Sequence, residues 1–161
     1  PTTYLSTITF QNETVVRLTL SFDVIAHQKN HIELYGKKGS MIVPDPNMFG
    51  GSVYVCKKSG DIWKEYKTNK MLLGKINIRS QSLRANESST NANYRGVGLA
   101  EMAYSIENKK VNKCNGELSL HVLDIIQSTM KACKTGTAQS IKTTCKKPQP
   151  FSLREIRKII K

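Results

Sequence analysis

The sequence predicts an α+β fold: one open, largely antiparallel or mixed β-sheet of about six or more strands, with helices packed on one face. Its first part alternates apolar and polar residues with a period of two, as strands do. The part after residue 93 places apolar residues at helical spacing instead. Because 161 residues suit one ordinary domain, we expect residues 1–161 to form a single domain.

Six strand segments account for most of the first half of the chain. The expected pairs are residues 4–10 with 15–24, residues 31–36 with 40–43, and residues 52–56 with 62–66. Short polar turns join the members of each pair, so the strands should pair as antiparallel hairpins. Residues 68–93 are polar and aperiodic, and they predict a long connection that is mobile around 85–93.

Helical patterns follow this connection. Residues 98–107 form a first expected helix, and residues 116–134 form a longer one that begins at the cap Asn115 and ends at Gly136. A short strand at residues 139–143 should return to the sheet edge. The capping box from Ser152 to Glu155 starts a last basic helix. The faces expected to be buried are Leu99, Met102, Ala103 and Ile106 in the first helix, and Leu118, Val122, Ile125, Ile126, Thr129 and Met130 in the second.

The net charge of +13 is concentrated in residues 108–161, which carry 12 basic and 3 acidic side chains. Such a field suits nucleic acid, an acidic membrane surface or an anionic cofactor. However, lysines outnumber arginines and occur one or two at a time, whereas nucleic-acid surfaces favour arginine interleaved with aromatic residues. We therefore expect no nucleic-acid partner, and a basic nucleic-acid-binding module is the alternative function.

The usual signatures of metal, membrane and nucleotide chemistry are missing from the sequence. Its four cysteines are far apart, which indicates reduced thiols in a cytoplasmic protein and no metal site. No apolar run is long enough for a membrane span, so we expect no membrane partner. No glycine fingerprint follows a strand, and no P-loop or nucleophile elbow is present.

Two sequence blocks carry a family resemblance. They are Asp45-Pro46-Asn47-Met48-Phe49-Gly50-Gly51 and Arg95-Gly96-Val97-Gly98-Leu99-Ala100-Glu101-Met102-Ala103. Together with residues 21–24, 31–36 and 116–124, this series resembles the C-terminal domain of the Gfo/Idh/MocA oxidoreductases, the glucose-fructose oxidoreductase and inositol dehydrogenase type, over about residues 2–151. Glu101 departs from the pattern, since similar sequences tend to have aspartate there.

The resemblance implies a substrate-binding and subunit-pairing domain of an NAD(P)-dependent oxidoreductase that acts on a sugar, cyclitol or related polyol. Family members carry a Rossmann domain with its glycine fingerprint and a Glu-Lys-Pro motif, neither of which occurs here. We therefore expect a piece of a longer polypeptide that is inactive alone. NAD or NADP would bind upstream of Pro1, and this chain would supply no catalytic, cofactor-binding or metal residue. A non-catalytic interaction protein derived from the domain is a further alternative.

The substrate-binding candidates are polar residues inside or beside the blocks: Asp23, His27, Arg95 and His121. Arg95 could hold an anionic or hydroxyl-rich group bidentately, or cap the loop before it. His121 is either a hydrogen-bonded core residue or a functional group. Asp45 and Asn47 are expected to satisfy backbone amides of a rigid loop. An uncovered sheet face with alternating apolar side chains should pair subunits into a homo-oligomer.

Overall fold

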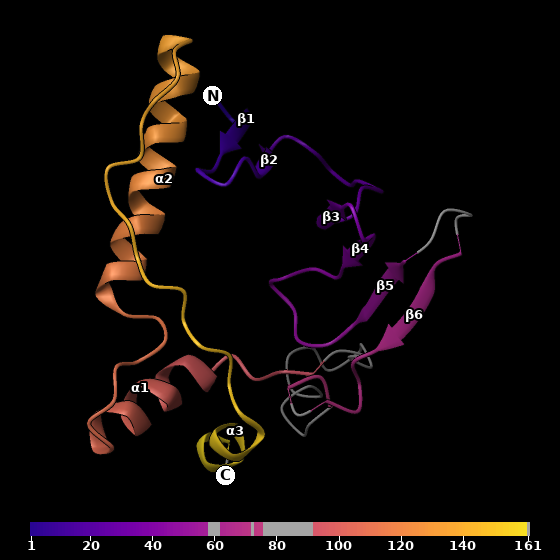
Figure 1. Ribbon diagram of the computed structural model, residues 1–161, viewed down its shortest axis with the longest axis vertical. Coiled ribbons are helices and arrows are strands. Elements are labelled where there is room, and N and C mark those ends of the chain that lie inside the picture. Colours follow the sequence, from indigo (N-terminus) through magenta and orange to yellow (C-terminus); the bar gives the residue numbers. More distant parts are fainter. Residues whose placement is uncertain (58–61, 72, 76–91, 161) are drawn as a thin grey trace. The chain divides into compact units, whose positions relative to one another are not determined.

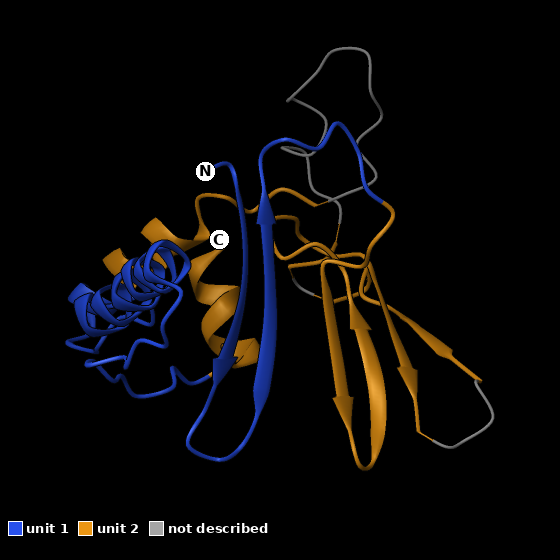
Figure 2. Cartoon of the chain, turned by 90° about the horizontal axis from the view of Figure 1, so that it is seen from above, with its two compact units in different colours: residues 1–27, 105–149 blue, residues 28–104, 150–161 orange. Residues whose placement is uncertain are grey.

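The computed structural model describes residues 1–57, 62–71, 73–75 and 92–160, and its elements form an α+β fold, as expected. The chain divides into two compact units, which are described one at a time (Figures 1 and 2). Unit 1 comprises residues 1–27 and 105–149, and unit 2 comprises residues 28–104 and 150–161. The elements are β1 (Thr3–Thr9), β2 (Val15–Ser21), β3 (Ile32–Gly36), β4 (Gly39–Val43), β5 (Ser52–Cys56), β6 (Lys64–Lys67), α1 (Val97–Glu107), α2 (Gly116–Thr135) and α3 (Leu153–Ile159).

A single six-stranded sheet is not shown, because the described strands form two sheets. One contains β1 and β2, and the other has the order β3-β4-β5-β6. The cause lies in the connection from β2 to β3, which is not a tight turn that would fix a pairing register. Its ends bond locally instead: the Asp23 amide donates to Ser21 Oγ at 3.3 Å, and Asn30 Nδ2 donates to Glu33 Oε1 at 2.6 Å.

The Asn30 contact also sets the ionisation of the first residues of β3. It is the main reason that the pKa of Glu33 is lowered, with a smaller effect from the Tyr35 hydroxyl. The hydrogen bond from Tyr35 to Glu33 raises the pKa of Tyr35 in turn. The start of β3 is therefore fixed by a local polar cluster.

Unit 1 contains the β1–β2 hairpin, with α2 packed on β1. The hairpin is antiparallel and pairs Tyr4 with Leu20 and Ser6 with Leu18. Along β1, half-buried residues alternate with exposed ones, which is the pattern of a strand covered on one side. Of the helix–strand pairs in the described part of the chain, α2 with β1 is in contact, and a layer of helices over one face of a six-stranded sheet is not shown.

The ends of α2 follow the sequence prediction closely. Asn115 is the N-cap, and its side chain accepts a hydrogen bond from the Leu118 amide at 3.0 Å. Gly136 ends the helix in the left-handed conformation, with φ 67°, and its amide bonds to the Ala132 carbonyl. The predicted boundaries of this helix are therefore confirmed to within one residue.

The strand predicted at residues 139–143 is not present. The amides of Lys142 and Thr143 both donate to Asp124 Oδ2 on α2, each at 2.9 Å. A carboxylate thus occupies the donors that a strand would have offered to a sheet edge. The segment runs along α2 as an irregular strap (Figure 1).

Unit 2 is built on the antiparallel sheet β3-β4-β5-β6, in which Met41 is level with both Leu34 and Val55. Its β3–β4 turn depends on Gly39, whose φ of 147° suits glycine alone. The unit also contains α3, which begins with the predicted capping box between Ser152 and Glu155. The long connection expected at residues 68–93 lies mostly outside the described residues, and so does most of the segment expected to be mobile.

The face of α1 that was expected to be buried is exposed. Leu99 and Ile106 are 69% and 71% exposed, whereas the polar Glu101 and Ser105 are buried. In the first turn of the helix, the Val97 amide donates to the Tyr94 carbonyl at 2.8 Å. Residues four and eight positions after Val97 share its half-buried face, and these are Glu101 and Ser105.

Candidate functional site

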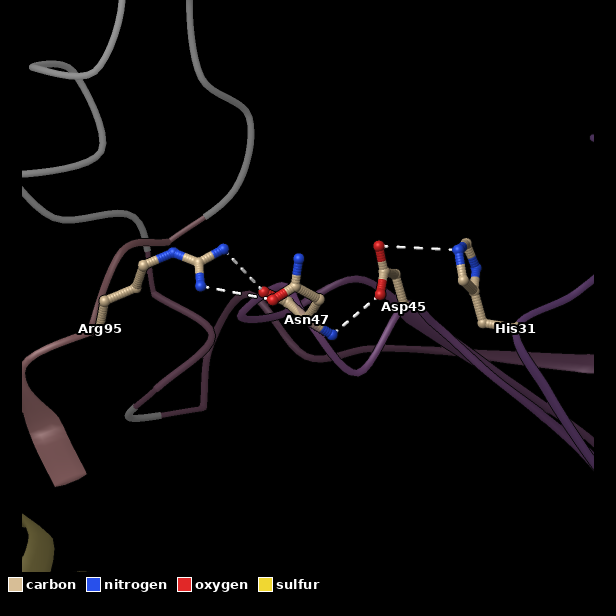
Figure 3. Close-up of polar contacts among 4 residues, drawn as sticks. All are labelled: His31, Asp45, Asn47 and Arg95. Carbon is tan, nitrogen blue, oxygen red and sulfur yellow. Dashed lines mark hydrogen bonds and ion pairs between the residues drawn. The ribbon is translucent and has the colours of Figure 1, made fainter. Parts of the chain in front are cut away.

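The two blocks that carry the family resemblance meet in unit 2 at Arg95. This residue lies two positions before the start of α1, and its guanidinium reaches back to the loop between β4 and β5 (Figure 3). Nη1 of Arg95 donates to Asn47 Oδ1 at 3.3 Å, and Nη2 donates to the Asn47 carbonyl at 3.1 Å. Arg95 therefore caps the β4–β5 loop through both side-chain and backbone oxygens, whereas the loop considered for this role was the one immediately before it.

Asp45 organises the interior of the same loop. Its Oδ1 accepts a hydrogen bond from the Asn47 amide at 2.8 Å, and its carbonyl accepts one from Met48 at 3.1 Å. This is the turn expected when an aspartate precedes proline and asparagine. Oδ2 of Asp45 lies 3.6 Å from Nε2 of His31, so the row of polar groups runs from His31 through Asp45 and Asn47 to Arg95 (Figure 3).

Contacts next to this row hold the two segments together. The rings of Phe49 and Tyr94 pack edge to face with centroids 5.8 Å apart, and Phe49 forms an isolated bridge with Ala92. Gly51 has φ 99°, and a Cβ there would lie 2.8 Å from Pro44 Cβ. The loop geometry thus depends on a glycine and an aromatic pair as well as on Arg95.

The chemistry available at this row is hydrogen bonding to oxygen-rich ligands. A guanidinium has five N–H donors, and in the described part of the chain the side-chain contacts of Arg95 are the two with Asn47. Arg95 is exposed, and the His31 side chain is 44% exposed. The row therefore presents cationic donors beside the Asp45 carboxylate, a combination that suits hydroxyl groups or an anionic group.

His121 lies in unit 1, within a second polar cluster on α2. Its Nδ1 is 3.0 Å from Thr143 Oγ1, and that hydroxyl donates to Asp124 Oδ2 at 2.9 Å. Since the hydroxyl proton is directed to the carboxylate, Nδ1 is assigned as the donor to Thr143 Oγ1. His121 thus makes the hydrogen bond that a core residue would need, and its role toward a substrate stays a prediction.

Asp124 is the centre of the second cluster. It accepts hydrogen bonds from the amides of Thr143 and Lys142, from the Thr143 hydroxyl and from Ser128. The Thr143 amide is the largest cause that lowers the pKa of this carboxyl, followed by the Thr143 hydroxyl. These bonds clasp the strap onto α2 and use the carboxylate oxygens within the fold.

Asp23 and His27 also belong to unit 1 and are exposed. The Thr2 hydroxyl donates to Asp23 Oδ2, which ties the residue after β2 to the start of β1. Of the four candidates, Arg95 alone belongs to unit 2. It contacts Asn47, which lies in the first of the two sequence blocks.

His31, Asp45 and Asn47 were not among the residues predicted to bind substrate. His31 follows a polar turn and gave no periodic signal, and Asp45 and Asn47 were assigned to backbone amides, a role that Asp45 does fulfil. The signal that could have found them is chemical: one block contains an acceptor carboxamide and the other a five-donor guanidinium.

The described residues contain no group of three or more His, Cys, Asp or Glu side chains placed to hold a metal ion. None of the helices described is long and apolar enough to cross a membrane. Comparison of the chain with protein-family models, with curated proteins and with solved structures found no match.

Proposed function

We propose that this chain is the substrate-binding and subunit-pairing domain of an NAD(P)-dependent oxidoreductase that acts on a sugar, cyclitol or related polyol. The observation that carries the proposal is the bidentate contact of Arg95 with Asn47, which lies 48 residues earlier in the sequence. These residues come from the two blocks on which the Gfo/Idh/MocA resemblance rests. Their contact gives the resemblance a structural counterpart.

A polyol presents neighbouring hydroxyl groups that both donate and accept hydrogen bonds, and the row offers partners for each. The remaining N–H groups of Arg95 can donate to a hydroxyl or carboxylate oxygen, while Asp45 can accept from a hydroxyl. A site that hydrogen-bonds hydroxyl groups discriminates strongly against analogues that lack them. In this proposal the chain binds and orients the substrate, and the cofactor and catalytic residues lie in a preceding domain.

Subunit pairing through the sheet of unit 2 is the second part of the proposal. One face of this sheet carries Leu34, Met41 and Val55 in register, and Leu34 is 52% exposed. A sheet face of this kind can pair isologously with the same face of another copy. The expected product is a homodimer, or a tetramer built from dimers.

The experiment begins with the codons upstream of Pro1, which should encode a glycine fingerprint and a Glu-Lys-Pro motif. The complete protein is then assayed with polyols as the wild type and as Arg95→Ala. We expect KM to rise by about tenfold or more with kcat little changed, because Arg95 supplies binding that is uniform between ground and transition states.

Arg17→Ala is the matched control, since Arg17 is an exposed arginine of β2. Its KM should equal that of the wild type. An Arg95→Ala enzyme with wild-type KM would contradict the binding role, and upstream codons without both motifs would contradict the oxidoreductase assignment itself.

A further inference from the structure

A stripe of large apolar side chains on α2 is exposed among the described residues of unit 1. Leu120, Leu123, Ile126 and Met130 are 56%, 48%, 51% and 50% exposed. At 100° per residue these four lie within an arc of about 120° on the helix. Leu118, Ile125 and Thr129 are half-buried and occupy a different face, so the stripe is not the surface that packs on β1.

Two exposed charges flank the stripe on the same side. Helical geometry places Glu117 and Lys131 about 40° apart, beyond the edge marked by Leu120. They are separated by four turns of the helix, or roughly 21 Å at 1.5 Å per residue, so they cannot pair with each other within one helix. The flank is therefore acidic at the start of α2 and basic toward its end.

We infer that this stripe binds α2 of a second copy of the chain, with the two helices antiparallel. A two-fold axis midway between Leu123 and Ile126 places Leu120 within one residue of the level of Met130 of the second copy. It also places Leu123 level with Ile126 of that copy. The same axis brings Glu117 to within about two residues of Lys131 of the second copy, and it does so twice.

Charge complementarity selects this arrangement over a parallel one. In a parallel pair the two flanks lie on opposite edges of the interface and these charges do not meet, whereas the antiparallel pair opposes Glu117 and Lys131 at both ends of one edge. Antiparallel helices also oppose their macrodipoles favourably. The stripe is apolar, which suits a second apolar helix rather than an anionic polymer, although the chain carries a net charge of +13.

The size of the stripe sets the expected affinity. Four half-exposed large side chains form a patch on the order of 400 Å², a size that on single-chain proteins is often functional. This is about half of what each partner contributes to a standard interface, so a dissociation constant in the micromolar range is expected. The α2 interface is separate from the sheet-face pairing, and the two together would produce a tetramer.

Mass measurement by light scattering at tens of micromolar, under reducing conditions, tests the inference on the chain itself. The variants are Leu123→Glu on the stripe, Leu34→Glu on the sheet face, and Leu153→Glu as a control, since Leu153 is an exposed leucine of α3. With both interfaces present, the wild type and the control are tetramers and each single interface variant is a dimer. With α2 pairing alone, Leu123→Glu is a monomer of 18.1 kDa and Leu34→Glu remains a dimer.

A Leu123→Glu variant with the wild-type mass overturns the α2 interface, as does a wild type that is monomeric. A Leu34→Glu variant with the wild-type mass would instead count against the sheet-face pairing. The α2 interface and the sheet-face pairing are therefore contradicted by different variants. Circular dichroism checks that the variants keep their helix content, which is expected because the substituted side chain is already half exposed.

A charge exchange tests the register without touching the apolar stripe. Glu117→Lys and Lys131→Glu should each raise the dissociation constant of the α2 dimer by about tenfold, because each puts like charges together at both ends. An equimolar mixture of the two variants restores opposite charges across the interface and should recover association. No recovery in the mixture would contradict the antiparallel register.

Discussion

The two polar clusters use their charged groups in opposite ways. In unit 1, Asp124 receives four hydrogen bonds from its own chain and joins the strap to α2. In unit 2, Arg95 makes two bonds to Asn47 and keeps further N–H donors at an exposed position. A charged side chain whose hydrogen-bonding capacity is used within the fold stabilises that fold, whereas one with capacity left over can also bind a ligand.

The largest effect on stability is expected at Gly39, on which the β3–β4 turn in the sheet of unit 2 depends. A Cβ at this position would lie 2.4 Å from the Cys56 carbonyl oxygen, and the φ of 147° is unfavourable for alanine. Gly39→Ala should lower the free energy of unfolding by about 3 kcal/mol, measured by urea denaturation.

Gly98→Ala is the control for this substitution. Nothing lies within 4 Å of a Cβ at Gly98, and the residue is in α1. Alanine should therefore be neutral there or stabilise by up to about 1 kcal/mol. A Gly39→Ala protein as stable as Gly98→Ala would show that the β3–β4 turn does not have the geometry described.

A smaller effect is expected at the N-cap of α2, which positions the clasp of unit 1. Asn115→Ala removes the acceptor for the Leu118 amide and should cost about 1 kcal/mol of unfolding free energy. Asn115→Ser keeps an acceptor oxygen and should lose only a few tenths of that amount. Equal losses in the two variants would mean that the hydrogen bond is not what matters at this position.

The smallest effect concerns pH and the Asp124 clasp, because this carboxylate is within reach of solvent screening. Its hydrogen bonds lower its pKa in the folded state, so the stability it contributes is present above the unfolded value of about 4. That contribution is lost as the pH falls through the folded pKa. Asp124→Asn should therefore have a lower Tm than the wild type at pH 7, and the difference should disappear in acid.

Glu107→Gln is the control for the pH series, since Glu107 is an exposed carboxylate at the end of α1. Its Tm difference from the wild type should be small at every pH. A difference for Asp124→Asn that persists unchanged to pH 3 would show that the carboxylate charge does not hold the strap.

Sequence pattern predicted the local structure well and the assembly of the elements poorly. The ends of α2 were predictable because Asn115 and Gly136 act on neighbouring backbone groups. The strand expected at residues 139–143 failed because its amides bond to Asp124, which is far away in the sequence. The buried face of α1 was also predicted wrongly, since Glu101 and Ser105 are buried while Leu99 and Ile106 are exposed.

The candidate site shows the same division. Arg95 was predicted because it lies inside a recognisable block, and Asn47 was taken as a local turn residue. Their pairing depends on a contact between distant segments, which periodicity does not reveal. His31 was missed because Asp45, which it contacts, lies in a different strand connection.

We propose that the row from His31 to Arg95 binds a polyol, and nuclear magnetic resonance on the labelled chain tests this binding. Myo-inositol or glucose is titrated into the wild type and into Arg95→Ala. We expect saturable shifts of the Arg95 Nε–H and Asn47 side-chain amide signals at millimolar concentrations of the polyol. The Thr143 amide signal should not shift, and the Arg95→Ala variant should show no response. Unchanged Arg95 and Asn47 signals at saturating polyol, or equal shifts in Arg95→Ala, would contradict it.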